Sequence, residues 1–200
     1  MANVVTHALG VLLSIAALVG MMITTWGDVW ETVSAVVFGG SLTLLYLFST
    51  LYHASTSVRM KGIFQALDHA CIYILIAGSY TPVMLLALRG SLGWTLLCVV
   101  WFMALAGVVI KTVLPGKKDH WISTALYILM GWLILLVLGP LIRAIPLAGF
   151  WWLLAGGISY TAGIVFFQWR KLPYHHAIWH LFVLGGSACH VAAVWLYVFR

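Results

Sequence analysis

Seven apolar runs, each long enough to cross a lipid bilayer, follow one another along the chain with short breaks between them. They lie near residues 5–25, 33–54, 64–88, 92–113, 121–142, 148–168 and 175–198. A membrane-spanning helix needs about 20 predominantly apolar residues. Because backbone groups in hydrocarbon must pair within their own segment, we expect each run to be an α-helix. The chain is therefore predicted to be an all-α membrane protein, a single seven-transmembrane-helix bundle over residues 1–200.

The amino-acid composition excludes a soluble protein. Charged residues make up 7% of the 200 residues, and hydrophobic residues make up 64%. A soluble domain carries about 25% charged residues, so most of this protein's surface must face lipid. The net charge of +6 lies in short clusters between the apolar runs, with no basic stripe along one element. We therefore expect no nucleic-acid partner and interpret the clusters as signals of membrane orientation.

The basic residues predict which way the bundle faces. The second, fourth and sixth breaks hold Arg59, Lys61, Lys117, Lys118, Arg170 and Lys171, whereas the other three hold Arg89 and Arg143. Loops on the cytoplasmic side of a membrane carry the excess of Lys and Arg. The N-terminus is therefore expected to be cytoplasmic and the C-terminus extracytoplasmic.

Two further features of the apolar runs carry structural expectations. Cys71, Cys98 and Cys189 all lie within runs and show no CxxC spacing, so buried free thiols are expected in place of a disulfide framework. Pro82, inside the third run, lacks a backbone donor and should kink this helix or end its regular part.

Rare polar residues of three separate runs meet at one depth. Ser49 and His53 lie towards the end of the second run, Asp68 near the start of the third, and His176 and His180 near the start of the seventh. Because successive runs alternate in direction, all five residues are expected near the cytoplasmic leaflet. Asp68 is the one acidic residue within any of the seven runs. Ionisable residues inside a membrane usually mark a functional site.

The spacing of the histidines favours a metal site. His176 and His180 are four residues apart and share one helix face, and His53 supplies a third nitrogen. Three protein ligands are usual for a catalytic zinc ion, which keeps one position for water. Ala177 occupies the place of the glutamate in the HExxH pattern, so Asp68 is the candidate general base. Ser49, one turn before His53, could orient Asp68, the water or a substrate carbonyl.

Other interpretations of the histidines stay open on spacing alone. Haem is the main rival ligand, although an i,i+4 pair suits a small ion better than a porphyrin. A membrane histidine can also simply bond to a neighbouring helix. We expect such a bond for His190, which lies about 21 Å along a helix from His176. His69 is expected to be structural, and the sequence assigns no role to His7.

Four segments carry a family resemblance: THALG, GGSLTLLYLFSTLYH, FQALDHACIYILIAGSYTP and PYHHAIWHLFVLGGSACH. Together they resemble the bacterial haemolysin III family, the prokaryotic branch of the progestin and adiponectin receptor group, which is itself grouped with alkaline ceramidases. The resemblance implies a seven-helix fold with a Zn2+ ion near the cytoplasmic leaflet. It implies His53, His176 and His180 as the zinc ligands, with Ser49 and Asp68 as catalytic residues beside the bound water.

The same resemblance implies a function at a bacterial inner or plasma membrane. Eukaryotic relatives are thought to hydrolyse lipid amides such as ceramide, so a zinc-dependent lipid amide hydrolase is expected, with a membrane lipid as substrate or ligand. The alternative is a non-enzymatic receptor-like, lipid-homeostasis or cytolytic membrane protein in which the zinc is structural. An open fourth coordination position favours hydrolysis, whereas four protein ligands favour a structural ion.

The orientation can be tested by chemical accessibility. In a variant without the natural cysteines, a new cysteine near Lys117 should react with an impermeant reagent only from the cytoplasmic side. A reporter fused after Arg200 should behave as extracytoplasmic, because the charge bias places these two positions on opposite sides. The reverse pattern would contradict the orientation and move the polar cluster to the outer leaflet.

Overall fold

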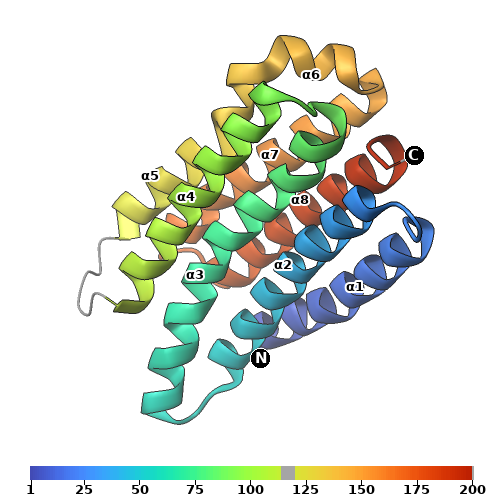
Figure 1. The fold of residues 1–200 in the computed structure, drawn as a ribbon. Coiled ribbons are helices and arrows are strands. Elements are labelled where there is room, and N and C mark those ends of the chain that lie inside the picture. Colours follow the sequence, from blue (N-terminus) through green and yellow to red (C-terminus); the bar gives the residue numbers. More distant parts are fainter. Residues whose placement is uncertain (114–119, 200) are drawn as a thin grey trace.

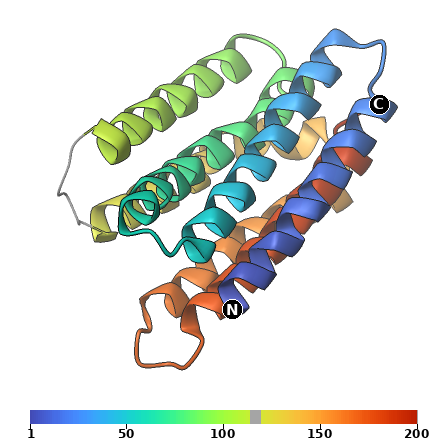
Figure 2. The ribbon, with the colours of Figure 1, turned by 90° about the horizontal axis from the view of Figure 1, so that it is seen from below.

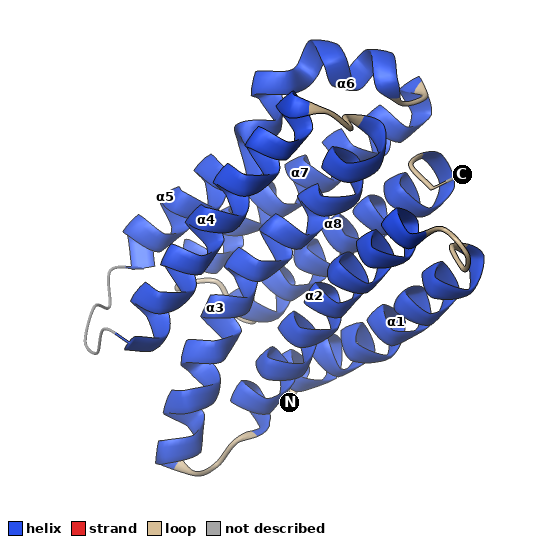
Figure 3. Cartoon of the chain, in the orientation of Figure 1, coloured by secondary structure: helices blue, strands red, loops and turns tan. Residues whose placement is uncertain are grey.

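Seven helices of spanning length form one bundle, as predicted (Figure 1). The computed structural model describes residues 1–113 and 120–199, and within these ranges the regular elements are all helical (Figure 3). They are α1 (Ala2–Thr24), α2 (Val29–Ala54), α3 (Val58–Pro82), the π-helix η1 (Val83–Ala87), α4 (Ser91–Val113), α5 (His120–Trp132), the 3-10 helix η2 (Leu133–Val137), α6 (Leu138–Ala144), α7 (Leu147–Gln168) and α8 (His175–Tyr197). The segments α5, η2 and α6 together make one span. The two chain ends lie at opposite ends of the bundle (Figure 1).

The first three helices begin several residues before the apolar runs that predicted them. The Asp28 carboxylate caps α2 by accepting a hydrogen bond from the Glu31 backbone N–H at 2.9 Å, and Ser57 is the N-cap of α3. The second break between the apolar runs is therefore not a break between helices at Arg59 and Lys61, since these residues lie in the first turns of α3. A helix can extend past the hydrocarbon with charged residues in its end turns, so hydropathy marks the span and not the helix. The fourth break, which holds Lys117 and Lys118, falls on residues 114–119, which lie outside the described residues.

The helices are arranged around a central space. Helix α8 packs between α7 and α1, α2 packs between α1 and α3, and α5 reaches both α3 and α7. Helix α4 lies outside this ring against α3 (Figures 1 and 2). Small residues permit the close approaches: a Cβ atom on Gly78 would overlap the Ser41 side chain of α2, and one on Gly186 would overlap the Tyr160 ring of α7. Such contacts between small residues and neighbouring helices are usual in membrane bundles.

Pro82 ends the α-helical part of α3, as predicted, and the π-helix η1 follows directly. Proline removes one backbone donor and crowds the preceding turn, so the regular ladder of hydrogen bonds stops there. A wider π turn is a common local response inside a long helix. The third span therefore continues to Ala87 with a changed helical form.

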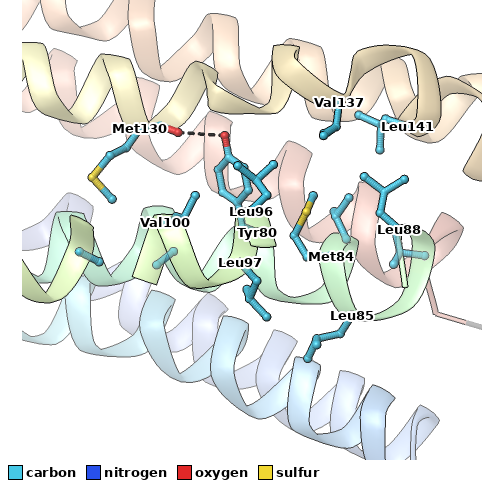
Figure 4. Packing of buried hydrophobic residues seen from close by; sticks show 14 of the residues in the cluster. Tyr80, Met84, Leu85, Leu88, Leu96, Leu97, Val100, Met130, Val137 and Leu141 are labelled. Carbon is cyan, nitrogen blue, oxygen red and sulfur yellow. Dashed lines mark hydrogen bonds between the residues drawn. The ribbon is translucent and has the colours of Figure 1, made fainter. Parts of the chain in front are cut away.

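The fifth span also changes its form, at the step from α5 to η2. Across this step the Tyr80 hydroxyl of α3 donates to the Met130 carbonyl oxygen at 2.9 Å and accepts from the Ile134 backbone N–H at 2.8 Å. Tyr80 lies among apolar side chains of α3, α4 and the fifth span (Figure 4). A backbone group without a helical partner in hydrocarbon must find one inside the protein. The Tyr80 hydroxyl is such a partner for the Met130 carbonyl before the step and for the Ile134 N–H after it.

Removal of this hydroxyl should destabilise the bundle. Tyr80→Phe leaves the Ile134 N–H without its partner, so we expect the free energy of unfolding to fall by about 1–3 kcal/mol. Thermal unfolding in detergent would measure the change. Tyr174→Phe is the matched control, since this tyrosine is 76% exposed and its hydroxyl should contribute little. Equal stability of the two variants would contradict the bridging role.

Candidate metal centre

Three imidazoles converge at the end of the bundle where the N-terminus lies. His53 comes from the last turn of α2, and His176 and His180 come from the first two turns of α8. One potential ligand atom of each lies within 4.8 Å of the others. The Nε2 atoms of His53 and His176 are 3.2 Å apart. Two nitrogens bound to one tetrahedral zinc ion are about 3.3 Å apart, since each Zn–N bond is about 2.0–2.1 Å.

The three rings are arranged as a propeller. Their centroids are 4.9 Å apart for His53 and His176, 5.1 Å for His53 and His180, and 4.7 Å for His176 and His180. The interplanar angles are 65°, 61° and 64° in the same order. Three imidazoles around one tetrahedral ion have centroids about 5 Å apart, because each centroid lies about 3 Å from the metal. The residues predicted as ligands are therefore brought together, and they fit one small metal ion.

The start of α8 sets which histidines face the cluster. Tyr174, the N-cap, has a left-handed backbone with φ 58°, which turns the chain into the helix at His175. The Nδ1 atom of the neighbouring His175 is within hydrogen-bond distance of the Phe166 carbonyl oxygen of α7, at 3.1 Å. His176 and His180 then follow on one face, one turn apart. Position along the helix therefore separates two adjacent histidines into different roles.

Helix α1 fixes the orientation of His180. The Thr6 hydroxyl lies 3.0 Å from His180 Nδ1, and it also lies 3.0 Å from the Ala2 carbonyl oxygen. A hydroxyl has one proton to donate, so donation to Ala2 leaves it to accept from a His180 Nδ1–H. This tautomer keeps the Nε2 lone pair of His180 for a metal, as partners of ligating histidines commonly do. The sequence analysis missed Thr6. Its signal was the polar pair Thr6–His7 in the first turns of an apolar run at this end of the bundle.

Asp68 and Ser49 line the cavity that two of the clustered imidazoles also line. They are 8% and 1% exposed, and the Ser49 hydroxyl is a hydrogen-bond partner of the Asp68 carboxyl. Both side chains line the same cavity as His176 and His180. An isolated carboxyl group is costly to bury in a membrane, so its placement here requires these partners. The structure therefore brings a potential proton acceptor to the cavity wall that carries the metal cluster.

The cavity extends from the cluster into the apolar centre of the bundle. Its volume is about 170 Å³, and a second cavity of about 280 Å³ shares Ser79, Tyr80, Trp132 and His190 with its lining. The two cavities run between α3, α5 and α7, where α5 packs less closely on α3 than α2 does. Mostly apolar walls with a few polar groups at one end are typical of a site for a lipophilic ligand.

The remaining histidines and the cysteines follow the sequence analysis in part. His190 makes the separate bond expected for it, with Nε2 3.3 Å from the Leu153 carbonyl oxygen. His69 lines the cavity, and its backbone carbonyl accepts from the Tyr127 hydroxyl at 2.9 Å. Cys71, Cys98 and Cys189 are free thiols, as predicted, but only Cys71 is buried within the protein, while Cys98 is exposed and Cys189 is partly exposed. These groups lie outside the three-histidine cluster.

Comparisons with known proteins cover nearly the whole chain. The family model described as "Haemolysin-III related" matches residues 1–191. The "Hemolysin-3 homolog" of Bacillus subtilis is 48% identical over 198 residues, which are 98% of this chain and 92% of that protein. "Hemolysin-3" of Bacillus cereus is 48% identical over 199 residues, 98% and 90% of the two chains. The human "Monocyte to macrophage differentiation factor" is 33% identical over 207 residues, which span 100% of this chain and 84% of that protein.

Metal content should depend on the three clustered histidines. Protein purified without chelator should carry close to one zinc ion per chain by elemental analysis. His53→Ala, His176→Ala and His180→Ala should each lose most of it, because each change removes one of three ligand nitrogens. His175→Ala is the matched control and should keep the metal, since its ring turns to Phe166. A Soret absorption band without zinc would instead identify haem.

Proposed function

Because the chain belongs to the haemolysin III family, we propose that this membrane protein is a zinc-dependent hydrolase of lipid amides, similar to a ceramidase. One observation supports the proposal most directly. The three imidazoles have the spacing of ligands to one ion, and two of them, His176 and His180, line the same cavity as the buried Asp68 carboxyl. Imidazole nitrogens are common zinc ligands, and a site with three of them keeps a coordination position for water or substrate.

The roles of the protein groups follow from hydrolysis of an amide. A zinc ion in such a site lowers the pKa of a bound water to about 7 and polarises a carbonyl group. Asp68 accepts the proton that the attacking water loses, and it then delivers this proton to the nitrogen of the leaving amine. A C–O bond forms and the C–N bond breaks, which yields a carboxylic acid and an amine. Ser49 holds the Asp68 carboxyl through its hydroxyl group.

The cavity supports a lipid as the substrate. Its walls are mostly apolar, and the polar groups Ser49, Asp68, His176 and His180 gather at one end. An acyl chain in the apolar part leaves its amide group among those polar residues, while the surrounding helices exclude bulk water. By the charge bias of the breaks, we place this end of the bundle at the cytoplasmic leaflet.

A second candidate is a non-enzymatic protein in which zinc clamps two helices, with a receptor-like, lipid-homeostasis or cytolytic role. Helices α2 and α8 each pack mainly on other helices, so an ion between His53 and the two α8 histidines would tie them together. One relative carries the name "Hemolysin-3", which suits the cytolytic variant of this role. The two candidates differ in what Asp68 does.

Substitution of Asp68 separates the two candidates. Asp68→Asn keeps the size of the side chain but cannot accept a proton, so lipid-amide hydrolysis should fall by about 10²–10⁴-fold with zinc content unchanged. Ser49→Ala should lower the rate by about 10–100-fold, since it removes a group that orients Asp68. Zinc content and turnover of ceramide-like and acyl-amide lipids would be measured in liposomes.

His53→Ala serves as the contrasting variant, because it should lose activity together with the metal. Asp28→Asn at the other end of the bundle is the matched carboxylate control and should leave both unchanged. If Asp68→Asn hydrolyses every lipid amide as fast as the unchanged protein and loses only thermal stability, the ion is a clamp and the hydrolase proposal is wrong.

A further inference from the structure

His7 is a buried imidazole for which neither the sequence nor the metal cluster accounts. It is 3% exposed, and neither ring nitrogen has a hydrogen-bond partner among the described residues. A buried polar group without a partner costs free energy, so it calls for an explanation such as a bound ligand. Of the buried side chains in the described ranges, Ser34 shares this property. His7 differs from Ser34 in its surroundings, since it lines the cavity beside the metal cluster and Ser34 does not.

The geometry of His7 does not suit a fourth metal ligand. Its ring lies flat on the His180 ring, with centroids 3.4 Å apart and planes 13° apart. Two imidazoles bound to one tetrahedral ion diverge from it, and their centroids lie about 5 Å apart. The stack therefore keeps His7 next to the cluster and outside the set of ligands.

The neighbours of His7 hold the ring in the cavity wall. The His7 ring also makes an edge contact with the Tyr46 ring, with centroids 5.1 Å apart and planes at 84°. The Tyr46 hydroxyl is engaged elsewhere, since it donates to the Ser187 hydroxyl at 2.7 Å. Helix α2 also contributes Ser49 to the cavity wall, and the Ser49 hydroxyl is hydrogen-bonded to the Asp68 carboxyl. His7 is thus a fixed imidazole whose two nitrogens are not used by these neighbours.

We propose that His7 binds the polar group of the lipid, and that it recognises a secondary amide. A neutral imidazole presents one N–H donor and one nitrogen acceptor. The two nitrogens of His7 point in diverging directions, so they pair with two different groups of the lipid. The acceptor nitrogen takes the N–H of a secondary amide, and the ring N–H is left to donate to a second oxygen of the same lipid. The substrate class rests on the proposed function, whereas the binding role rests on the burial, the stack and the cavity. An ester or a tertiary amide lacks the N–H and leaves the His7 acceptor unpaired.

The expected selectivity is large enough to measure. A site that buries a polar group for hydrogen bonding rejects an analogue without the matching group, because the protein atom is then left unpaired. We expect a fatty ester or N-methyl fatty amide to bind roughly ten- to a hundredfold more weakly than the matching secondary amide. His7→Phe retains a stacked ring but no polar atom, so it should bind all three lipids within about threefold of one another.

The experiment measures binding separately from hydrolysis. Zinc-loaded protein in phosphatidylcholine nanodiscs is first bound to a fluorescent fatty amide. Each of the three lipids is then added as a competitor, and the fluorescence change on displacement of the probe is recorded before any turnover. His7→Asn keeps a donor and an acceptor and should restore part of the preference for the secondary amide. Ser34→Ala is the matched control, because it removes the other unpartnered polar group away from the cavity, and it should keep the full preference. Zinc content is measured for every variant.

Several outcomes would overturn the assignment. It is wrong if the unchanged protein binds the three lipids equally, or if His7→Phe keeps the preference for the secondary amide. It is also wrong if His7→Phe and His7→Asn both lose zinc, since His7 would then act through the metal cluster. A preference that depends on His7 without any hydrolysis would support the binding role and contradict the hydrolase proposal. Hydrolysis that proceeds without this preference would support the hydrolase proposal and contradict the binding role of His7.

Discussion

Hydrocarbon offers no hydrogen bonds, so every polar group that this chain carries into the membrane must find its partner inside the bundle. The threonines of α2 meet this requirement locally, as Thr43 and Thr50 donate to carbonyl oxygens one turn earlier at 2.9 and 2.7 Å. Tyr80 meets it between helices, where the fifth span changes form. Three imidazoles in one small volume could satisfy it by sharing a cation, and His53, His176 and His180 lie close enough to bind one metal ion.

The same requirement explains how the site and the cavity divide the bundle. Helices α1, α2, α3 and α8 approach one another closely at glycines and serines, and they deliver the polar side chains to one end. Helix α5 makes fewer close contacts with α3 and α7, and the cavity lies along it with mostly apolar walls. A polar cluster at the end of an apolar cavity can hold a molecule that has both characters. Lipid amides are such molecules.

Much of this arrangement could be read from the sequence, because two strong patterns carry it. Apolar runs of spanning length predict the helices, and the i,i+4 spacing of His176 and His180 predicts a shared face. The helix starts could not be read in this way, since Asp28 and Ser57 cap helices beyond the apolar runs. The roles of Thr6 and His7 depend on contacts with His180, which lies more than 170 positions away, and no spacing within α1 encodes such a contact. The change of form after Trp132 depends on Tyr80 of another span for the same reason.

The order of the helices along the chain has a consequence for biosynthesis. His53 is on the second helix, while His176 and His180 are on α8, the last helix that the structure describes. Chains enter the membrane from the N-terminus onwards during translation. Six spans must therefore be inserted while His7 and His53 lack the α8 imidazoles that contact them. A metal ion that needs all three imidazoles could thus be bound only late in biogenesis, and its binding would report that the seventh span has been inserted and docked.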